Sequence, residues 1–311
     1  MKKGLMLSLE GINYTWKTPF AEWLKRDFSE GREVVITRDP PYFLSPWDSL
    51  VEFFERREEM SRLAEAMMLL AARFDNNERV IIPAISRGAL VIADRYIDSW
   101  LAYQSVRLAD YFGKNPVMVR EFLVGINEAM VSQGFIVRPD LTILIVDDPE
   151  RTIERKHREE KTSKYDFIDV QQRVLGQYLE LADLFPDRIV RVEVFEKDIH
   201  EAYVVISALV RNWLKAAASG DATSVFPSIS TIKKGDRLMA LRRISWTVEE
   251  FDDYPLVVES GDTATVTFVQ DGEGKIGVQF DKDEYPEISK SLNLATNERF
   301  SCIVLRQTLG C

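Results

Sequence analysis

Residues Leu5–Pro19 read LMLSLEGINYTWKTP. The apolar run Leu5–Leu9 predicts a buried strand, and Gly11 to Thr18 follow the spacing of a phosphate-binding loop, Gly-x-x-x-x-Gly-Lys-Thr, with one exception. Trp16 stands where the motif has its second glycine. Such a loop wraps nucleotide phosphates with backbone N–H groups, and a glycine lets the backbone approach them without a Cβ in the way. The stretch therefore predicts a nucleotide-binding unit and leaves open whether a loop with an indole still binds phosphate.

Short apolar segments alternate with amphipathic ones through the first two thirds of the chain. Strands are expected at Leu5–Leu9, Val34–Thr37, Leu90–Ala93, Leu141–Val146 and Ile189–Val194. Helical stripes lie between them, as at Phe20, Leu24 and Phe28, and a last helix is expected over Ile199–Ala218. This alternation predicts an α/β fold with a five-stranded parallel sheet flanked by helices, whose ligands lie at the carboxyl ends of the strands.

The pattern changes after a linker rich in small residues at 217–227. Strands are expected at Arg237–Trp246, Thr263–Val269, Lys275–Phe280 and Phe300–Leu305. The turn Asp271-Gly272-Glu273-Gly274 is typical of a hairpin. We therefore expect an α/β domain over 1–216 and a small all-β accessory domain over 228–311, of the SH3-like barrel type. The sequence of this second domain reveals no catalytic constellation.

Composition limits the partners. The net charge of −10 disfavours binding to nucleic acid or to an anionic membrane through charge alone. The acidic segment around Glu249–Asp253 points the same way for the C-terminal domain. Two cysteines among 311 residues suit a reducing cytoplasm, and no apolar run reaches the roughly 18 residues that would span a bilayer. We expect a cytoplasmic protein with neither membrane nor direct nucleic-acid partners.

Six blocks, in order, resemble those of the thymidylate kinases, and the resemblance spans roughly residues 1–215. They are Glu10-Gly11 to Lys17-Thr18, Thr37-Arg38-Asp39-Pro40, Glu65 to Arg73, Asp94-Arg95-Tyr96 with Ser99 and Ala102-Tyr103-Gln104, Pro139-Asp140-Leu141-Thr142, and Asp166–Asp169 followed by Tyr178-Leu179-Glu180. The resemblance implies a P-loop kinase that uses ATP and Mg²⁺. It further implies transfer of a phosphoryl group to a deoxynucleoside monophosphate, either dTMP or a 5-substituted analogue, by a homodimer. The partner of the C-terminal domain is unknown.

The resemblance also assigns roles to individual residues. The ATP-binding set comprises Gly11, Asn13, Tyr14, Thr15, Trp16, Lys17, Thr18 and Arg155. The substrate-binding set comprises Arg38, Phe53, Arg73, Arg95, Ser99, Tyr103 and Gln104. The catalytic set comprises Lys17, Arg38, Asp94 and Arg95, and the Mg²⁺ ligands are Thr18 and Asp94. By resemblance, Arg73 bonds a thymine carbonyl, and Tyr103 and Gln104 crowd the 2′ position of the sugar and contact the base.

Each residue also has a plainer interpretation. Asp94 ends an apolar strand, where it suits Mg²⁺ or, equally, the N-cap of the next helix. Arg38 and Arg95 follow neighbouring strands and suit phosphate, although surface ion pairs are the usual fate of arginine. Arg73 would otherwise extend from the edge of its helix toward solvent. Phe53 (or its neighbour) is as suited to a core as to stacking on a base.

The donor side departs from the family in three places. Trp16 replaces glycine, and Pro19 removes a backbone N–H that would help to hold the α-phosphate, although proline also suits a first helical turn. Phe167 and Ile168 stand where many relatives have an arginine. Charge from Arg155-Lys156-His157-Arg158, Lys161 and Lys164 would compensate, unless this is simply a solvated loop.

Three hypotheses follow: a working kinase, a degenerate kinase that binds a deoxynucleotide as a sensor or scaffold, and a structural relic of both sites. If the indole turns away onto Trp23 or Pro19, the loop stays open to phosphate.

Overall fold

The computed structural model describes residues 4–41, 43, 46, 60–156, 167–195 and 197–218, together with the backbone of seven strands between 237 and 305. The contacts within the chain divide it into two compact units, Met1–Val190 and Arg191–Cys311. Each unit is described by itself.

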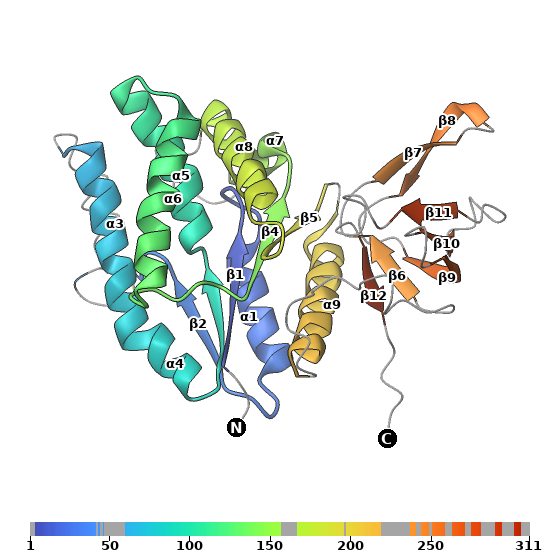
Figure 1. Cartoon of the computed structure of the whole chain (residues 1–311), viewed down its shortest axis with the longest axis horizontal. Helices are drawn as coiled ribbons and strands as arrows, with labels where there is room; N and C mark the ends of the chain where they lie inside the picture. Colours follow the sequence, from blue (N-terminus) through green and yellow to red (C-terminus); the bar gives the residue numbers. More distant parts are fainter. Residues whose placement is uncertain are drawn as a thin grey trace. The chain divides into compact units, whose positions relative to one another are not determined.

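A five-stranded parallel sheet forms the centre of the first unit (Figure 1). Its strands are β1 (Leu5–Glu10), β2 (Val34–Arg38), β3 (Leu90–Asp94), β4 (Leu141–Val146) and β5 (Ile189–Glu193), in the order β2-β3-β1-β4-β5. All five strands lie within one residue of the predicted ranges. Because β1, β3 and β4 are buried along their whole length, they are largely apolar on both faces, as expected for parallel strands between helices.

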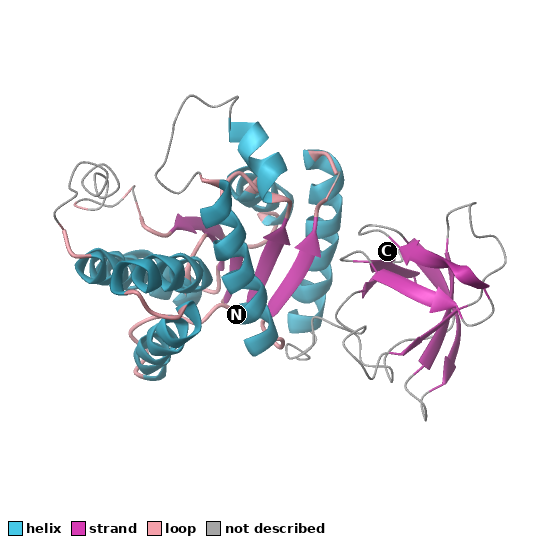
Figure 2. Ribbon diagram, turned by 90° about the horizontal axis from the view of Figure 1, so that it is seen from above, coloured by secondary structure: helices cyan, strands magenta, loops and turns pink. Residues whose placement is uncertain are grey.

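Helices flank this sheet (Figure 2). They are α1 (Lys17–Phe28), α3 (Arg62–Asn76), the π-helix η2 (Asn77–Ile81), α4 (Ile82–Ser86), α5 (Ile97–Phe112), α6 (Pro116–Ser132), α7 (Pro149–Lys156) and α8 (Ile168–Leu184). Helix α1 packs against β1, β2 and β3, and α5 contacts α3, α6 and α8. Helix α5 is buried on nearly all sides because it carries apolar and small residues around its whole circumference.

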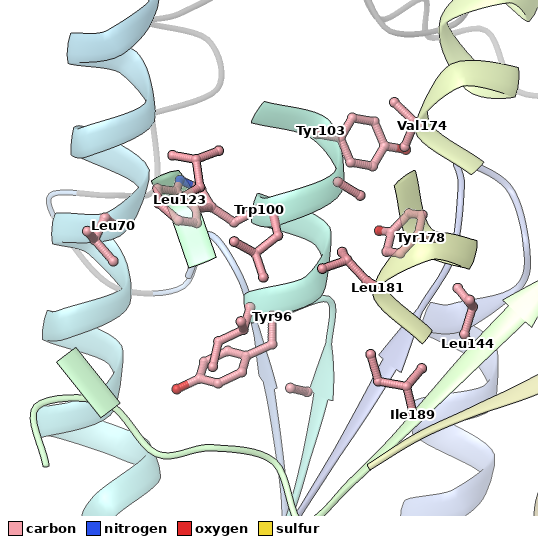
Figure 3. Packing of buried hydrophobic residues seen from close by; sticks show 14 of the residues in the cluster. Leu70, Tyr96, Trp100, Tyr103, Leu123, Leu144, Val174, Tyr178, Leu181 and Ile189 are labelled. Atoms are coloured by element: carbon pink, nitrogen blue, oxygen red, sulfur yellow. The ribbon is translucent and has the colours of Figure 1, made fainter. Parts of the chain in front are cut away.

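The main hydrophobic core of this unit lies between α5 and its neighbours (Figure 3). Trp100 points from α5 toward α3, whereas Tyr103 and Tyr178 meet edge to face with ring centroids 6.3 Å apart. Val174 and Leu181 extend the same contact along α8. This packing holds the start of α5 beneath the carboxyl edge of the sheet, where the polar residues gather.

The second unit contains α9 (Ile199–Ala218), as predicted, and the C-terminal strands. The strands are β6 (Arg237–Ala240), β7 (Ile244–Val248), β8 (Phe251–Val258), β9 (Thr263–Gln270), β10 (Lys275–Phe280), β11 (Lys290–Asn293) and β12 (Cys302–Leu305). The single strand predicted over Arg237–Trp246 is wrong, because β6 belongs to a sheet of order β11-β10-β9-β6-β12 and β7 pairs with β8. A ten-residue run also exceeds the usual strand length. The SH3-like barrel stays a prediction.

Among the helices that the structure describes, none is long and apolar enough to cross a membrane.

Candidate active site

The register of the parallel strands collects the candidate residues at one edge of the sheet. Arg38, the last residue of β2, pairs with Asp94, the last residue of β3, and Leu9 of β1 pairs with Asp94 from the other side. Glu10 pairs in turn with Leu144 of β4. Because the carboxyl ends of parallel strands meet at one edge, residues that are 84 positions apart, such as Gly11 and Arg95, come into contact there.

The loop after β1 contains three residues with positive φ: Gly11, Tyr14 and Trp16. Gly11 has φ +145°, and a Cβ built on it would lie 2.6 Å from the carbonyl oxygen of Ile145, so only glycine fits. Tyr14 (φ 62°) and Trp16 (φ 59°) are left-handed although neither is glycine. Each such residue costs about 1–2 kcal/mol, so other contacts must hold the loop in this shape.

Lys17 turns inward to the loop. Its Nζ donates to the carbonyl oxygen of Ile12 at 2.5 Å and to Oγ1 of Thr15 at 2.9 Å, and Thr15 Oγ1 also donates to Ile12 O at 3.0 Å. Burial, together with the positive charge of Arg95, lowers the pKa of Lys17 well below its ordinary value. Bound phosphate would reverse this shift by supplying negative charge.

Trp16 is the left-handed residue that precedes α1. Its half-buried indole meets Phe20 edge-on, with ring centroids 6.2 Å apart, while Trp23 packs against Phe20 instead. The other partner of the indole is Arg155 of α7, whose guanidinium carbon lies 3.7 Å from the ring centroid. The indole therefore finds neighbours on α1 and α7.

Thr18 and Asp94 form a hydroxyl–carboxylate pair that suits Mg²⁺. Thr18 Oγ1 donates to Asp94 Oδ2 at 2.5 Å, and Arg38 Nε lies 3.7 Å from the same oxygen. The second oxygen, Asp94 Oδ1, is buried without a hydrogen-bond partner in the described part of the chain. Hard oxygen ligands that leave room for phosphate oxygens and water are what Mg²⁺ prefers, so these residues fit the expected ion. Asp94 does not cap α5, because Tyr96 occupies the N-cap position.

Arg95 lies beneath the loop and connects it to the helices. Its guanidinium donates to Gly11 O at 2.9 Å, Asn13 Oδ1 at 2.7 Å and Ser99 Oγ at 3.2 Å. Tyr103 donates its hydroxyl to the same Asn13 oxygen at 2.9 Å. The network thus joins five of the predicted residues from the loop, the end of β3 and α5.

Gln171 belongs to this network although it was not among the predicted residues. Its Oε1 accepts from the backbone N–H of Asn13 at 3.0 Å and from the Tyr103 hydroxyl at 3.4 Å, and the residue is 1% exposed. A signal for it exists in the sequence, because Gln171 interrupts the apolar stripe of α8 three residues before Val174 and seven before Tyr178. A buried amide on such a stripe needs partners, and here these are the loop and α5.

Glu10 is buried at the base of the same network. It accepts from Ser8 at 2.7 Å, from Ser99 at 2.5 Å and from the Tyr178 hydroxyl at 3.5 Å. Burial and the negative charge of Asp98 raise the pKa of Glu10 from its ordinary value of 4.5 to about 7. Ser99, predicted to bind substrate, is therefore occupied in this structure with Glu10, Arg95 and Tyr178.

Arg73 is held rigidly at the other end of the site. It is 1% exposed, its Nε donates to Asp39 Oδ2 at 2.5 Å, and its guanidinium lies between the rings of Tyr96 and Trp100 at 5.3 and 5.4 Å. Its Nη1 and the Oε1 of Gln104 are both buried without hydrogen-bond partners among the described residues. Arg73 therefore does not extend to solvent.

Asn76 and Asn77, also missed from the sequence, support this end of the site. Asn77 accepts from the Tyr96 hydroxyl at 2.9 Å and donates to Arg73 O at 2.8 Å, while Asn76 joins α3 to Thr37 at 2.9 Å.

Two parts of the predicted site lie outside the described residues: Phe53, and the charged segment His157, Arg158, Lys161 and Lys164.

The strand order and the flanking helices define a protein of the α/β class with a five-stranded parallel sheet. The thymidylate kinase family profile matches residues 9–202, and the chain belongs to that family, whose members are phosphotransferases.

Individual relatives agree with this membership. A probable thymidylate kinase of Pyrococcus horikoshii is 31% identical over 217 residues, covering 66% of this chain and 96% of that protein. A thymidylate kinase of Verminephrobacter eiseniae is 30% identical over 219 residues, covering 68% and 94%. The crystal structure of thymidylate kinase from Ehrlichia chaffeensis superposes with a TM-score of 0.50 at 21% identity over 67% of this chain and 98% of that one, which supports the fold.

Proposed function

We propose that the chain transfers the γ-phosphoryl group of ATP to the 5′-phosphate of dTMP, or of a 5-substituted analogue, giving ADP and the nucleoside diphosphate. One observation carries this proposal: two side chains meet at the carboxylate of Asp94, directly beside the phosphate loop. The Thr18 hydroxyl, which is suited to bind Mg²⁺, lies 2.5 Å from Asp94 Oδ2, and Arg38 Nε lies 3.7 Å from the same oxygen. Phosphoryl transfer depends on positioning and charge neutralisation, and this edge of the sheet offers both.

The roles divide along the edge. Loop N–H groups and Lys17 bind the β- and γ-phosphates of ATP, while Arg38 and Arg95 hold the acceptor and the transferred phosphoryl group. Thr18 and Asp94 would hold Mg²⁺. When bound, the ion neutralises charge on the phosphate oxygens.

The base end favours thymine or uracil over cytosine. Among the residues that the structure describes, Arg73 Nη1 and Gln104 Oε1 have no hydrogen-bond partner. Trp100, whose ring lies 5.4 Å from the Arg73 guanidinium, is one helical turn before Gln104 on the same face of α5. A donor and an acceptor complement the 4-carbonyl and N3–H of thymine, whereas cytosine presents the reverse pattern. Tyr103, Ser99 and Phe53 complete the proposed sugar and base contacts.

A second candidate is a degenerate kinase that binds the deoxynucleotide and transfers little. Two observations favour it: Lys17 is bonded within its own loop, and Pro19 offers no N–H where an α-phosphate would need one. Loss of one such charge-assisted bond weakens binding of ATP by about ten- to a hundredfold, which lowers efficiency without forbidding transfer.

The test is ADP formation from ATP with Mg²⁺. A kinase requires turnover that depends on dTMP and that Lys17→Ala abolishes, while Lys25→Ala, an exposed lysine on the same helix, leaves it unchanged. Arg73→Ala should remove the thermal stabilisation by dTMP, and dCMP should stabilise the wild-type chain far less than dTMP or dUMP.

Stabilisation by dTMP without turnover would select the degenerate binder. Absence of any effect of dTMP or ATP at millimolar concentration would exclude both candidates.

We further propose a homodimer and a division into a kinase domain over 1–216, a linker over 217–227 and a small β-barrel accessory domain over 228–311. The accessory domain would serve a protein partner that the sequence does not identify.

A further inference from the structure

One guanidinium contacts both of the strained residues in the phosphate loop. Tyr14 and Trp16 have φ angles of 62° and 59°, in the region that glycine enters freely and larger residues avoid. Arg155 Nη1 donates to the carbonyl oxygen of Tyr14 at 3.2 Å, and its plane lies over the Trp16 ring at 3.7 Å.

Arg155 is itself anchored. Its Nη1 lies 2.6 Å from Oδ2 of Asp147, a fully buried carboxylate that directly follows β4. Asp147 is therefore fixed by the sheet, and Arg155 extends from α7 with its charge compensated and only 19% of its side chain exposed. The chain of contacts runs from the end of β4 through one arginine to the loop.

The chemistry of this contact depends on a planar cation. A guanidinium can stack on an indole face while its edge donates hydrogen bonds to a carbonyl and a carboxylate. The ammonium of lysine could pair with Asp147 but could not stack in this way. The same indole is the residue that replaces the glycine of the motif, so the stack exists only because the glycine is missing.

We propose that Arg155 is a positioning residue that holds Trp16 and Tyr14 in their left-handed conformations, so that a phosphate loop without its second glycine keeps a binding shape. Arg155 acts through Trp16 rather than as a ligand of the nucleotide. This inference rests on the proposed function only in taking ATP as the ligand of the loop.

A double-mutant cycle on the full chain tests the proposal, with the Kd for ATP in the presence of Mg²⁺ measured by calorimetry. In the wild-type background, Arg155→Met should raise the Kd about tenfold, because the variant loses a partly desolvated cation–π stack and a hydrogen bond. In the Trp16→Gly background the same change should raise the Kd less than about twofold, because glycine adopts the left-handed conformation without support from Arg155. Arg155→Lys should weaken binding nearly as much as Arg155→Met, and only beside Trp16.

Arg151→Met is the matched control. Arg151 lies one turn earlier on α7 and 4.0 Å from Asp147, so its replacement should leave the Kd unchanged in both backgrounds. Melting temperatures of all variants show whether a raised Kd reflects unfolding. If Arg155→Met alone melts at a lower temperature, recovery of ATP binding in the double variant Trp16→Gly, Arg155→Met still supports the positioning role of Arg155.

An equal rise in both backgrounds would overturn the proposal, since that is the behaviour of a direct ATP ligand. A wild-type chain that fails to bind ATP at millimolar concentration would overturn it as well. Failure of the proposed kinase function would give a different result. ATP would still bind, and the double-mutant cycle would still show that the effects of Arg155 and Trp16 depend on each other, but no dTMP-dependent turnover would be measured.

Discussion

At the scale of single residues, the site concentrates costly conformations and buried charge. Tyr14, Trp16 and Arg95 are the non-glycine residues with positive φ in the described chain, and all three belong to the loop after β1 or contact it. Strain of this kind persists where surrounding contacts over-determine the backbone, as Arg155 and Asn13 do here. The loop is therefore supported from α7, α5 and α8 as well as by hydrogen bonds among its own residues.

Glu10→Gln tests the electrostatics of this cluster. The raised pKa means that folded Glu10 binds its proton more tightly than unfolded Glu10, so its contribution to the free energy of unfolding is greatest below pH 4.5 and falls as pH rises toward 7. A shift from 4.5 to about 7 corresponds to about 3 kcal/mol. The free energy of unfolding should be measured with urea at about pH 5 and about pH 8. Between these two pH values, the wild-type chain should lose up to about 3 kcal/mol more of this free energy than Glu10→Gln.

The glutamine is close to isosteric and can still bond Ser99 and Tyr178, so packing is preserved. Identical pH dependence of the two chains would mean that Glu10 is already ionised at pH 5 in the folded protein.

At the scale of elements, a buried ion pair fixes where α5 begins. Arg188, just before β5, forms two hydrogen bonds with Asp98 in the first turn of α5, at 2.6 and 2.8 Å, and a third with Thr142 of β4 at 2.8 Å. Asp98 is 1% exposed, and its charge raises the pKa of nearby Glu10. The pair therefore connects the position of α5, which carries Ser99, Tyr103 and Gln104, to the sheet.

Arg188→Met should destabilise the chain by about 3–5 kcal/mol, because it leaves the Asp98 carboxylate buried and unpaired. Adding Asp98→Asn should recover a large part of this loss, since the uncompensated charge is then gone. Chemical denaturation of the single and double variants measures both effects.

Arg173→Met provides the comparison at the surface. Arg173 and Asp110 form an exposed pair, with 42% and 54% of their side chains accessible, so its loss should cost less than about 1 kcal/mol. Similar costs for Arg188→Met and Arg173→Met would contradict a buried structural role for the Asp98 pair.

At the scale of the whole molecule, two divisions of the chain differ. Contacts within the chain separate Met1–Val190 from the rest, whereas the family profile extends to residue 202. The alignments to two relatives cover 66% of this chain and 98% and 96% of the relatives' own lengths. Helix α9 carries a buried apolar face. Its members are Ala202, Val205, Ile206, Leu209, Val210 and Trp213. A helix with such a face is not stable alone in water, so it needs a partner within the fold.

A chain ending at Ala218 should fold, be stabilised by dTMP and keep the wild-type ATP-binding affinity, because relatives that end near this point are complete proteins. A chain ending at Val194 should lose these properties, since the α9 face is then missing. Circular dichroism melting with and without dTMP distinguishes the two. Loss of dTMP binding in the longer fragment would assign the C-terminal strands to the kinase unit.

The sequence alone determined the five parallel strands and the helices α1 and α9, because burial between layers and helical periodicity both leave local patterns. It also placed the residues at the carboxyl edge, since the ends of strands are readable from apolar runs. Only the tertiary structure decided the contact of Trp16 with Arg155, that of Gln171 with Asn13 and that of Arg188 with Asp98, because each joins residues at least 90 positions apart. The spacing of the loop shows that a glycine is missing. Whether the loop keeps its shape depends on Arg155, 139 positions further along the chain, which no local pattern connects to it.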